Sequence, residues 1–297
     1  MKLKDYYRDY YDRYIGMLAP STQEGYRSSI GLYVLPQWGE WELHEIRVRH
    51  INAWLASFES PGAADKAYKC LRQILRSSMG DEIYPEDVVD PTTRGIRKPK
   101  MPWSGDAPFL TEREVGELLV AVVGWEYEPL VICGVWMGLR RSEQCGLQWG
   151  DINLRTGVVR ISRGLQRVKR EVVETEVKTH RSMRPMMLPW CAVERMREIK
   201  RERRARPGDW IMGDNLDPER YSRRLKSLCR SGGVAYVAPK YFRHTFDTLQ
   251  HRSGATDSEV AKMLGHTSVR TGYRYMTLDE DFLREKQKAY ERRIMKA

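Results

Sequence analysis

The stretch Pro129-Leu-Val-Ile-Cys-Gly-Val-Trp-Met-Gly-Leu139 decides how the rest of the chain is arranged. Its side chains are apolar on nearly every side, so a helix formed by it needs protein packed around its whole circumference. A bilayer-spanning helix takes about 20 consecutive apolar residues, and this stretch is too short for that. We therefore expect it to be the central helix of a globular domain.

The segments on either side of this helix predict the rest of that domain. Thr111-Glu-Arg-Glu114 is a capping box that opens a helix reaching Val123. Residues 157–162, 171–177 and 183–188 are β-branched or alternate in polarity, which indicates a short antiparallel sheet. Helical patterns resume at about Pro218–Cys229, near Lys240, at Ser258–Leu264 behind a capping box at Thr256, and over the charged stretch Asp279–Ile294.

The first ninety residues predict a small bundle of helices. Ser21-Thr-Gln-Glu24 is a capping box for a helix that Pro36 closes, a second helix covers about 48–58, and a third follows Pro61 and stops before Gly80. Residues 90–106 then contain three prolines, two glycines and four basic residues, which is typical of an exposed linker.

We therefore expect a mainly α fold with a small antiparallel β-sheet, of the α+β class. A helical domain at residues 1–90, a basic linker at 91–107 and a second domain with a C-terminal tail at 108–297 would account for the chain.

Charge is the informative part of the composition. The net charge is +11, and it is uneven: residues 1–90 carry 11 Lys and Arg against 14 Asp and Glu, a net of −3, which leaves +14 for residues 91–297. Such a concentration of positive charge predicts a polyanionic partner, and the alternative is ordinary charge that keeps the protein soluble. Charge alone does not distinguish DNA, RNA and anionic membranes as partners. The five cysteines are scattered without a CxxC pair, which argues against a zinc site or a disulfide framework and fits a reducing cytoplasm.

Four short segments carry residues suited to chemistry on a phosphate. They are Gly138-Leu-Arg-Arg-Ser-Glu143, Val177-Lys-Thr-His-Arg181, Lys240-Tyr-Phe-Arg-His-Thr245 and Leu264-Gly-His-Thr-Ser-Val-Arg-Thr-Gly-Tyr-Arg-Tyr275. Each has an ordinary structural explanation when taken alone. Arg140, for example, can pair with Glu143 at a helix end, and Lys178 can be a solvated turn residue.

Together, and in this order, the four segments resemble the tyrosine recombinase family over nearly the whole chain. The resemblance implies a helical core-type DNA-binding domain followed by a catalytic domain. The Gly-Leu-Arg-x-Ser-Glu motif maps the first catalytic arginine onto Arg140, with Glu143 as its supporting acid, and the Lys-Thr-x-x-x-x-Arg motif points to Lys178. The His-x-x-Arg-His box aligns with Lys240, Arg243 and His244, and Leu-Gly-His followed by a tyrosine nine residues later gives His266 and the nucleophile Tyr275.

One residue departs from the family pattern, because Lys240 stands where the box has its first histidine. A lysine can donate a hydrogen bond to a phosphate, but it cannot serve as a base at neutral pH as an imidazole can. The implied reaction is attack by the Tyr275 oxygen on a phosphodiester. The two arginines would stabilise the developing charge and Lys178 would protonate the departing 5′ oxygen. The 3′-phosphotyrosine would then be resealed by another strand, with no metal or cofactor.

The resemblance also implies partners. Double-stranded DNA with core attachment-type sites would be contacted by Arg94, Arg97, Lys98 and Lys100 of the linker, and by Arg141 and His244. A homotetramer on DNA is expected, a directionality factor is possible, and the location would be the bacterial host cytoplasm at the nucleoid. Since the core-binding pattern starts by about residue 20, we expect no arm-binding domain.

The C-terminal stretch leaves two arrangements open. Its narrow apolar stripe of Leu283, Tyr290 and Ile294 suits docking on a neighbouring subunit, and the alternative is packing on its own domain.

Two other functions remain open at this stage. A type IB topoisomerase shares the chemistry but reseals the original strand, and a catalytically silent DNA-binding protein would keep only the fold.

Overall fold

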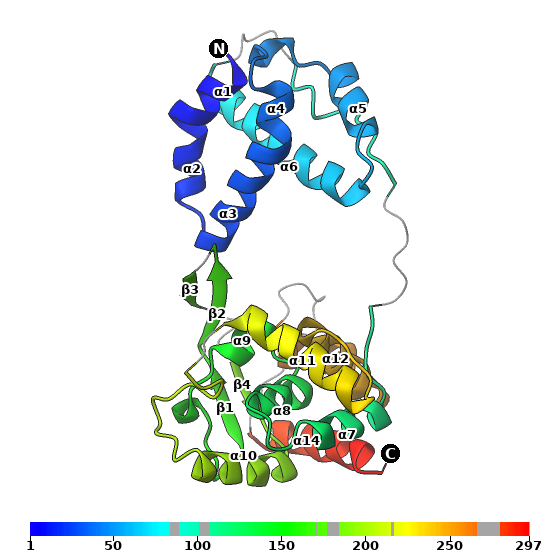
Figure 1. Ribbon diagram of the computed structural model, residues 1–297. Coiled ribbons are helices and arrows are strands. Elements are labelled where there is room, and N and C mark those ends of the chain that lie inside the picture. Colours follow the sequence, from blue (N-terminus) through cyan, green and yellow to red (C-terminus); the bar gives the residue numbers. More distant parts are fainter. Residues whose placement is uncertain are drawn as a thin grey trace. The chain divides into compact units, whose positions relative to one another are not determined.

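The computed structural model describes residues 1–83, 89–100, 107–169, 171–176, 184–214, 217–265 and 280–296. The chain forms two compact units, Met1–Gly105 and Asp106–Ala297, and each has its own hydrophobic core (Figure 1). The described helices include none long and apolar enough to cross a membrane.

The regular elements of the first unit in its described residues are all helical, apart from an isolated bridge between Lys2 and Glu42. Two of its helical runs each contain a π-helical turn, and the buried rings of Trp38 and Trp54 pack edge to face at its centre. Its elements are α1 (Leu3–Tyr6), η1 (Tyr7–Tyr11), α2 (Asp12–Gly16), α3 (Pro20–Ser29), η2 (Ile30–Val34), α4 (Leu35–Trp38), η3 (Leu43–Glu45), α5 (Val48–Ala56) and α6 (Pro61–Gly80).

Both predicted boundaries of the helix at 21–36 are wrong. Helix α3 begins at Pro20 after Ala19, because proline at the first helical position presets the backbone and needs no capping side chain. Pro36 does not end the helical run, which continues to Trp38. The π-helical turn η2 directly precedes α4, the helix that contains Pro36. Its wider hydrogen-bond spacing accommodates a proline, which has no N–H to donate to the regular α-helical hydrogen bonds.

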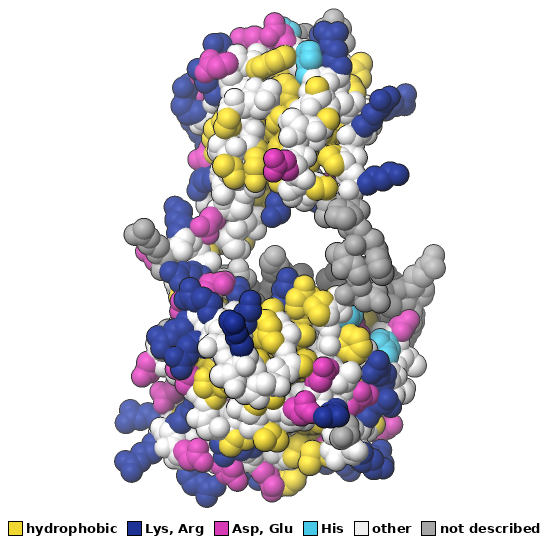
Figure 2. Space-filling model, turned by 45° about the vertical axis from the view of Figure 1, so that its right-hand side comes forward, with side chains coloured by type: hydrophobic (Ala, Val, Ile, Leu, Met, Phe, Trp, Pro, Cys, Tyr) yellow, Lys and Arg dark blue, Asp and Glu magenta, His cyan; other side chains and the backbone are white. Residues whose placement is uncertain are grey.

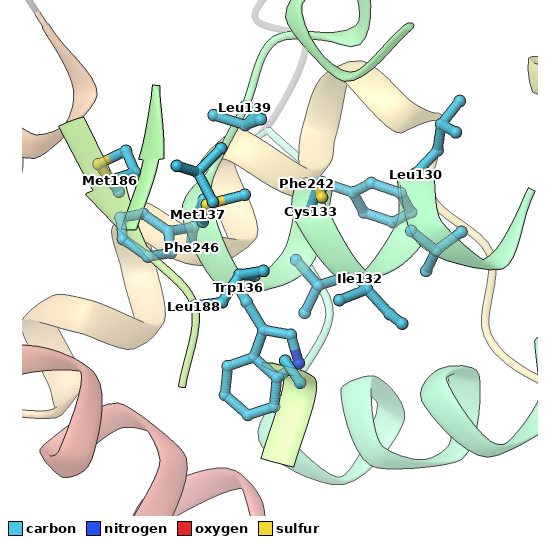
Figure 3. Close-up of a cluster of buried hydrophobic side chains, with 14 of the residues drawn as sticks. Leu130, Ile132, Cys133, Trp136, Met137, Leu139, Met186, Leu188, Phe242 and Phe246 are labelled. Atoms are coloured by element: carbon cyan, nitrogen blue, oxygen red, sulfur yellow. The ribbon is translucent and has the colours of Figure 1, made fainter. Parts of the chain in front are cut away.

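The second unit is built around the expected central helix. All ten residues of α8 (Glu128–Met137) are buried, which confirms the prediction from its apolar circumference. Figure 3 shows Ile132, Cys133, Trp136 and Met137 among side chains of other elements. The remaining elements are α7 (Glu112–Ala121), α9 (Arg141–Cys145), η4 (Trp149–Asp151), β1 (Val158–Ile161), β2 (Arg163–Val168), β3 (Glu171–Glu176), β4 (Arg184–Met187), α10 (Trp190–Glu202), α11 (Pro218–Gly232), η6 (Pro239–Tyr241), α12 (Phe242–Arg252), α13 (Asp257–Leu264) and α14 (Glu280–Ile294).

The antiparallel β structure is confirmed, but it forms two pairs of strands instead of one sheet. β1 pairs with β4, in the register Val158 opposite Met187, and β2 pairs with β3. Strand β2 was not predicted. Gly164 interrupts its pattern, and a Cβ there would lie 3.2 Å from the Cβ of Ser142, so the glycine allows β2 to lie close against α9.

Both capping boxes predicted in this unit are present. The Thr111 N–H donates to Glu114 at 2.8 Å and opens α7, and the Thr256 N–H donates to Glu259 at 2.7 Å and opens α13. Such boxes form between residues three apart, so they can be recognised without knowledge of the tertiary structure.

The C-terminal helix packs on its own unit, so the expectation that its stripe docks on a neighbour is wrong for this structure. Leu283, Tyr290 and Ile294 are buried, and the Tyr290 hydroxyl donates to the Val135 carbonyl at 3.2 Å. The stripe is wider than it looks in the sequence, because the Gln287 amide is also buried and donates to the carbonyl of Trp136.

Ion pairs add to the attachment of α14. Lys286 lies 2.8 Å from Glu259, and Arg293 lies 2.6 Å from Glu112 at the start of α7. Figure 2 shows Lys and Arg side chains crowding one flank of the second unit, with acidic side chains among them.

Candidate active site

The candidate site begins where the central helix ends. Gly138 closes α8 in the left-handed conformation, with φ of 60°, and Arg140 is the N-cap of α9. A Cβ on Gly138 would lie 2.8 Å from side-chain atoms of Phe246 in α12 and Leu264 in α13. The glycine therefore allows the turn that carries Arg140 to lie directly against these two helices.

Arg140 is held by the acid that the sequence analysis assigned to it. Its Nη1 lies 2.6 Å from Oε1 of Glu143, and its backbone N–H donates to Oε2 at 2.9 Å. The Glu143 side chain is 4% exposed, whereas the Arg140 side chain is 43% exposed. The carboxylate thus holds Arg140 by its backbone N–H and by one guanidinium nitrogen, and the rest of the guanidinium stays accessible to a ligand.

A second arginine, Arg184, contacts the other oxygen of the Glu143 carboxylate. Arg184, the first residue of β4, donates from Nη2 to Oε2 of Glu143 at 3.2 Å and from Nε to the Met263 carbonyl at 2.7 Å. It is buried and ties the start of β4 to both α9 and the end of α13. Burial alone would raise the pKa of Glu143, but the charge and hydrogen bond of Arg184 and the Arg140 backbone hydrogen bond hold it below its usual value.

The third cation, Arg243, lies in the first turn of α12. It donates from Nη1 to the Gly138 carbonyl at 3.4 Å and from Nη2 to the Leu264 carbonyl at 2.5 Å. Burial, followed by the charges of Arg140 and Arg184, lowers the pKa of Arg243 to about 9. Two guanidinium groups thus contact Glu143 and a third lies close to them, with Glu143 and Asp247 as the described carboxylates that act on it, and this excess of positive charge favours a bound anion.

Gln144 fixes the turn between α8 and α9 through hydrogen bonds from both ends of its side-chain amide. It is buried, its Nε2 donates to the Leu139 carbonyl at 2.8 Å, and its Oε1 accepts from the Tyr221 hydroxyl at 3.1 Å. Both ends of its side-chain amide are used, so the backbone on the N-terminal side of Arg140 is anchored to α11.

The other predicted residues of the second unit lie in different surroundings. Lys240 is exposed in η6, with its Nζ 4.6 Å from the ring centre of Tyr241. The His244 ring meets Phe109 edge to face at 6.1 Å. Arg141 is 2.8 Å from Glu219 and bonds Ser222, so it reaches toward α11 and does not join the cluster around Glu143.

Three predicted catalytic residues, Lys178, His266 and Tyr275, lie outside the described residues. The structure therefore brings Arg140, Glu143 and Arg243 together without testing their proposed partners. Arg184 was missed, although the motif Lys-Thr-x-x-x-x-Arg that pointed to Lys178 ends on it.

The basic residues that follow the first helical bundle lie in the first unit. Lys98 is 2.9 Å from Asp65 and lies over the Tyr68 ring, and the Arg97 backbone N–H donates to Asn52 at 2.8 Å. Arg94 and Lys100 are exposed. Residues 90–98 therefore lie along α5 and α6, and these contacts with Asn52 and Asp65 fix the path of their backbone.

Comparisons with known proteins agree with this architecture. The phage integrase family matches residues 109–281, and the phage integrase N-terminal SAM-like domain matches residues 2–58. The chain is 26% identical to the integrase of Mycobacterium phage FRAT1 over 87% of its own length and 79% of that protein. It is also 26% identical to the tyrosine recombinase XerA of Thermococcus onnurineus over 82% of each chain.

Solved structures show the same fold. The Tn1549 transposon integrase in complex with transposon right end DNA matches with a TM-score of 0.69 and 18% identity, over 97% of this chain and 99% of that one. A lambda integrase tetramer bound to a Holliday junction matches with a TM-score of 0.64 and 15% identity, over 94% of this chain and 80% of that one.

Proposed function

Since the chain belongs to the phage integrase family, and is a site-specific tyrosine recombinase that acts on DNA, we propose that Arg140 and Arg243 hold the scissile phosphate while Tyr275 attacks it. The observation that carries this proposal is the excess of positive charge at the ends of α8, α9, α12 and α13. Arg140 and Arg184 contact the carboxylate of Glu143 there, and Arg243 lies close to both of them, with Asp247 as the second described carboxylate in its surroundings. A phosphodiester is the anion on which this family acts.

The proposed reaction uses the two accessible arginines as hydrogen-bond donors. The Tyr275 phenol gives up its proton to water and its oxygen bonds to phosphorus, the bond to the 5′ oxygen breaks, and the charge gathers on the non-bridging oxygens. Guanidinium groups present paired donors to such oxygens, and one preorganised donor is typically worth about 100- to 1,000-fold in rate. His266 adds a further donor, and Lys178 delivers the proton to the departing 5′ oxygen.

Resealing reverses these steps with a different strand. A 5′ hydroxyl of the partner duplex attacks the 3′-phosphotyrosine and gives its proton to the Lys178 amine. The bond between phosphorus and the Tyr275 oxygen breaks, and the released phenolate takes a proton from water. Lys240, in the place of a family histidine, is proposed as a hydrogen-bond donor to the phosphate and has no role as a base. The type IB topoisomerase alternative is not supported by any observation here, because the family that matches is that of the integrases.

The assembly is proposed from relatives, among which a lambda integrase forms a tetramer on a Holliday junction. We propose a homotetramer on double-stranded DNA with core attachment-type sites, in the bacterial cytoplasm where that DNA lies, with a directionality factor as a possible further partner. Residues 1–90 would be the core-type DNA-binding domain and residues 108–297 the catalytic domain, joined by the basic segment 91–107. Arg94, Arg97, Lys98, Lys100, Arg141 and His244 would contact DNA.

Covalent trapping tests the proposed chemistry. A duplex selected by the wild-type protein from a random pool is nicked near the cleavage site, so that a cleaved strand diffuses away and the adduct accumulates. Tyr275→Phe should bind this duplex normally and form no adduct. Tyr273→Phe should keep most of the activity, because Tyr273 lies two residues short of the motif's spacing from His266. An adduct formed by the Tyr275→Phe protein would show that another residue is the nucleophile.

The arginines are tested on the same duplex. Arg140→Ala should lower the cleavage rate by about 100-fold or more with little change in affinity. Arg113→Ala is the control, because this exposed arginine pairs with Glu117 away from the cluster. Lys178→Ala should be rescued by a 5′-bridging sulfur, since a thiolate leaves without a proton. Lack of rescue would argue against Lys178 as the acid.

A further inference from the structure

The first unit contains a basic hollow that the proposed active site does not use. It has a volume of about 970 Å³ and lies between the N-terminus of α5 and the segment after residue 89. Arg47, Arg49 and Arg94 line it together with Val48 and Asp90. Figure 1 shows this segment running beside α5.

The positive charge of the hollow is not neutralised from within the described part of the chain. Arg47, Arg49 and Arg94 make no ion pair with a described carboxylate, and all three are exposed. Asp90 has its oxygens engaged elsewhere: Oδ1 accepts from the backbone and hydroxyl of Thr92, and Oδ2 lies 3.2 Å from Nε of Arg76. The first N–H groups of α5 add their partial positive charge at the same place.

The hollow is also held in shape before any ligand binds. Asn52, on α5, donates from Nδ2 to the Gly95 carbonyl at 2.9 Å and accepts from the Arg97 N–H at 2.8 Å. Gly95 has φ of 76°, and a Cβ there would lie 3.3 Å from Val48. Arg94 precedes this clamp directly, so its backbone is fixed beside Arg47 and Arg49.

We infer that Arg47, Arg49 and Arg94 form one binding site for a single phosphate of the DNA backbone, with Asn52 as the positioning residue of the site. This inference rests on the proposed action on DNA and deepens it, because it adds Arg47 and Arg49 to the proposed contacts, joins Arg94 to them and gives Asn52 the role of positioning Arg94. A phosphate site carries no base contact, so it fixes the register of the first unit on a duplex whatever the sequence.

Salt titration of binding tests the site, because each phosphate neutralised on B-DNA contributes about −0.9 to the slope of log K against log salt concentration. The full chain is titrated with a random-sequence duplex in rising NaCl. The triple variant Arg47→Ala, Arg49→Ala, Arg94→Ala should reduce the magnitude of the slope by about 0.9, since one phosphate is lost. An unchanged slope overturns the inference, and so does a loss of about 2.7, which means three separate contacts.

A matched control separates the site from net charge. Lys2, Lys4 and Arg8 belong to the same unit, and each already contacts a carboxylate, that of Glu40 or Asp9. Replacing these three cations by alanine removes as much charge as the triple variant and should leave the slope unchanged. An equal loss in this control would mean that only overall charge matters, which overturns the inference.

The role of Asn52 is tested by non-additivity. Asn52→Ala should weaken duplex binding about as much as Arg94→Ala, by roughly tenfold, and should have no further effect in the Arg94→Ala background. Equal weakening in both backgrounds would contradict positioning through Arg94. Melting temperatures confirm that each variant is folded.

Covalent trapping on the selected duplex keeps the two hypotheses apart. If the wild-type protein forms no adduct, the proposed function fails. If it forms the adduct while the triple variant keeps the wild-type salt slope, only the phosphate site fails.

Discussion

Replacing Arg184 by methionine removes a cation from the least exposed part of the candidate site while keeping much of its apolar volume. In the wild type the carboxylate of Glu143 is buried between Arg184 and Arg140. Without Arg184 it keeps only the contacts of Arg140, and the Met263 carbonyl loses its donor. Removing one partner of a buried ion pair costs about 3–5 kcal/mol of unfolding free energy, because the remaining charge stays buried.

The pH dependence of this loss identifies its cause. In the wild type the pKa of Glu143 lies below its usual value, so the stabilisation from its ionisation is present at neutral pH and disappears as the pH falls through the folded-state pKa. In the variant only Arg140 still contacts the buried carboxylate, so its pKa should be higher than in the wild type, and protonation toward pH 5 should relieve part of the cost. The difference in stability between the two proteins should therefore be largest at pH 7 and smaller at pH 5.

Scanning calorimetry on the full chain measures this difference. For a domain of this size about 1 kcal/mol corresponds to 2–4 °C, so the second unit should melt roughly 6–20 °C lower at pH 7. Arg195→Met is the control for activity, because Arg195 pairs with the buried carboxylate of Glu128 outside the site. It should lower stability and leave the cleavage rate unchanged at temperatures where the protein is folded, whereas Arg184→Met should lower both. A loss of stability that is equal at the two pH values would refute the reasoning.

Two more substitutions and one truncation test the second unit further. Gly138→Ala should cost about 2–4 kcal/mol in denaturant unfolding, since its φ of 60° and the 2.8 Å approach of Phe246 both oppose a Cβ; a neutral effect would mean that the helices shift freely. Arg243→Met should abolish cleavage and change the melting temperature at neutral pH little, because folding disfavours the charged form of Arg243, a cost fully present below about pH 9, while the Gly138 and Leu264 carbonyls lose a donor; a large loss of stability would contradict this. Truncation after Thr277 should lower stability by several kcal/mol, since burial of each large apolar side chain is worth about 1.5–3 kcal/mol and α14 buries Leu283, Tyr290 and Ile294; proteolysis at the wild-type rate would show that α14 is dispensable.

Features that depend on a few neighbouring residues could be predicted from the sequence. The boxes at Thr111 and Thr256 form between residues three positions apart, and the apolar circumference of α8 is visible without any tertiary information. The predicted start of α3 was wrong because Pro20, at the first helical position, begins the helix one residue before Ser21. Strand β2 could not be predicted, because Gly164 interrupts its pattern and the reason for a glycine there is the close approach of α9, which comes from another part of the chain.

In the candidate site too, contacts between near neighbours in the sequence could be predicted and contacts between distant residues could not. Arg140 and Glu143 are three residues apart, and their ion pair follows from that spacing. The contact of Arg184 with Glu143 joins residues 41 positions apart, and Arg243 bonds a carbonyl 105 positions away. Apart from its place at the end of the Lys-Thr-x-x-x-x-Arg motif, nothing local distinguishes Arg184 from the many other arginines, because its importance comes from burial beside a carboxylate.

The carbonyl contacts of Arg243 have a consequence for the thermodynamics of DNA binding. A free arginine side chain carries about 2 kcal/mol of rotamer entropy, which is lost when it is immobilised. The Gly138 and Leu264 carbonyls fix the guanidinium already in the folded protein, and they use two of its five N–H donors. That entropy is therefore lost during folding, and the remaining donors meet a phosphate without a further ordering cost.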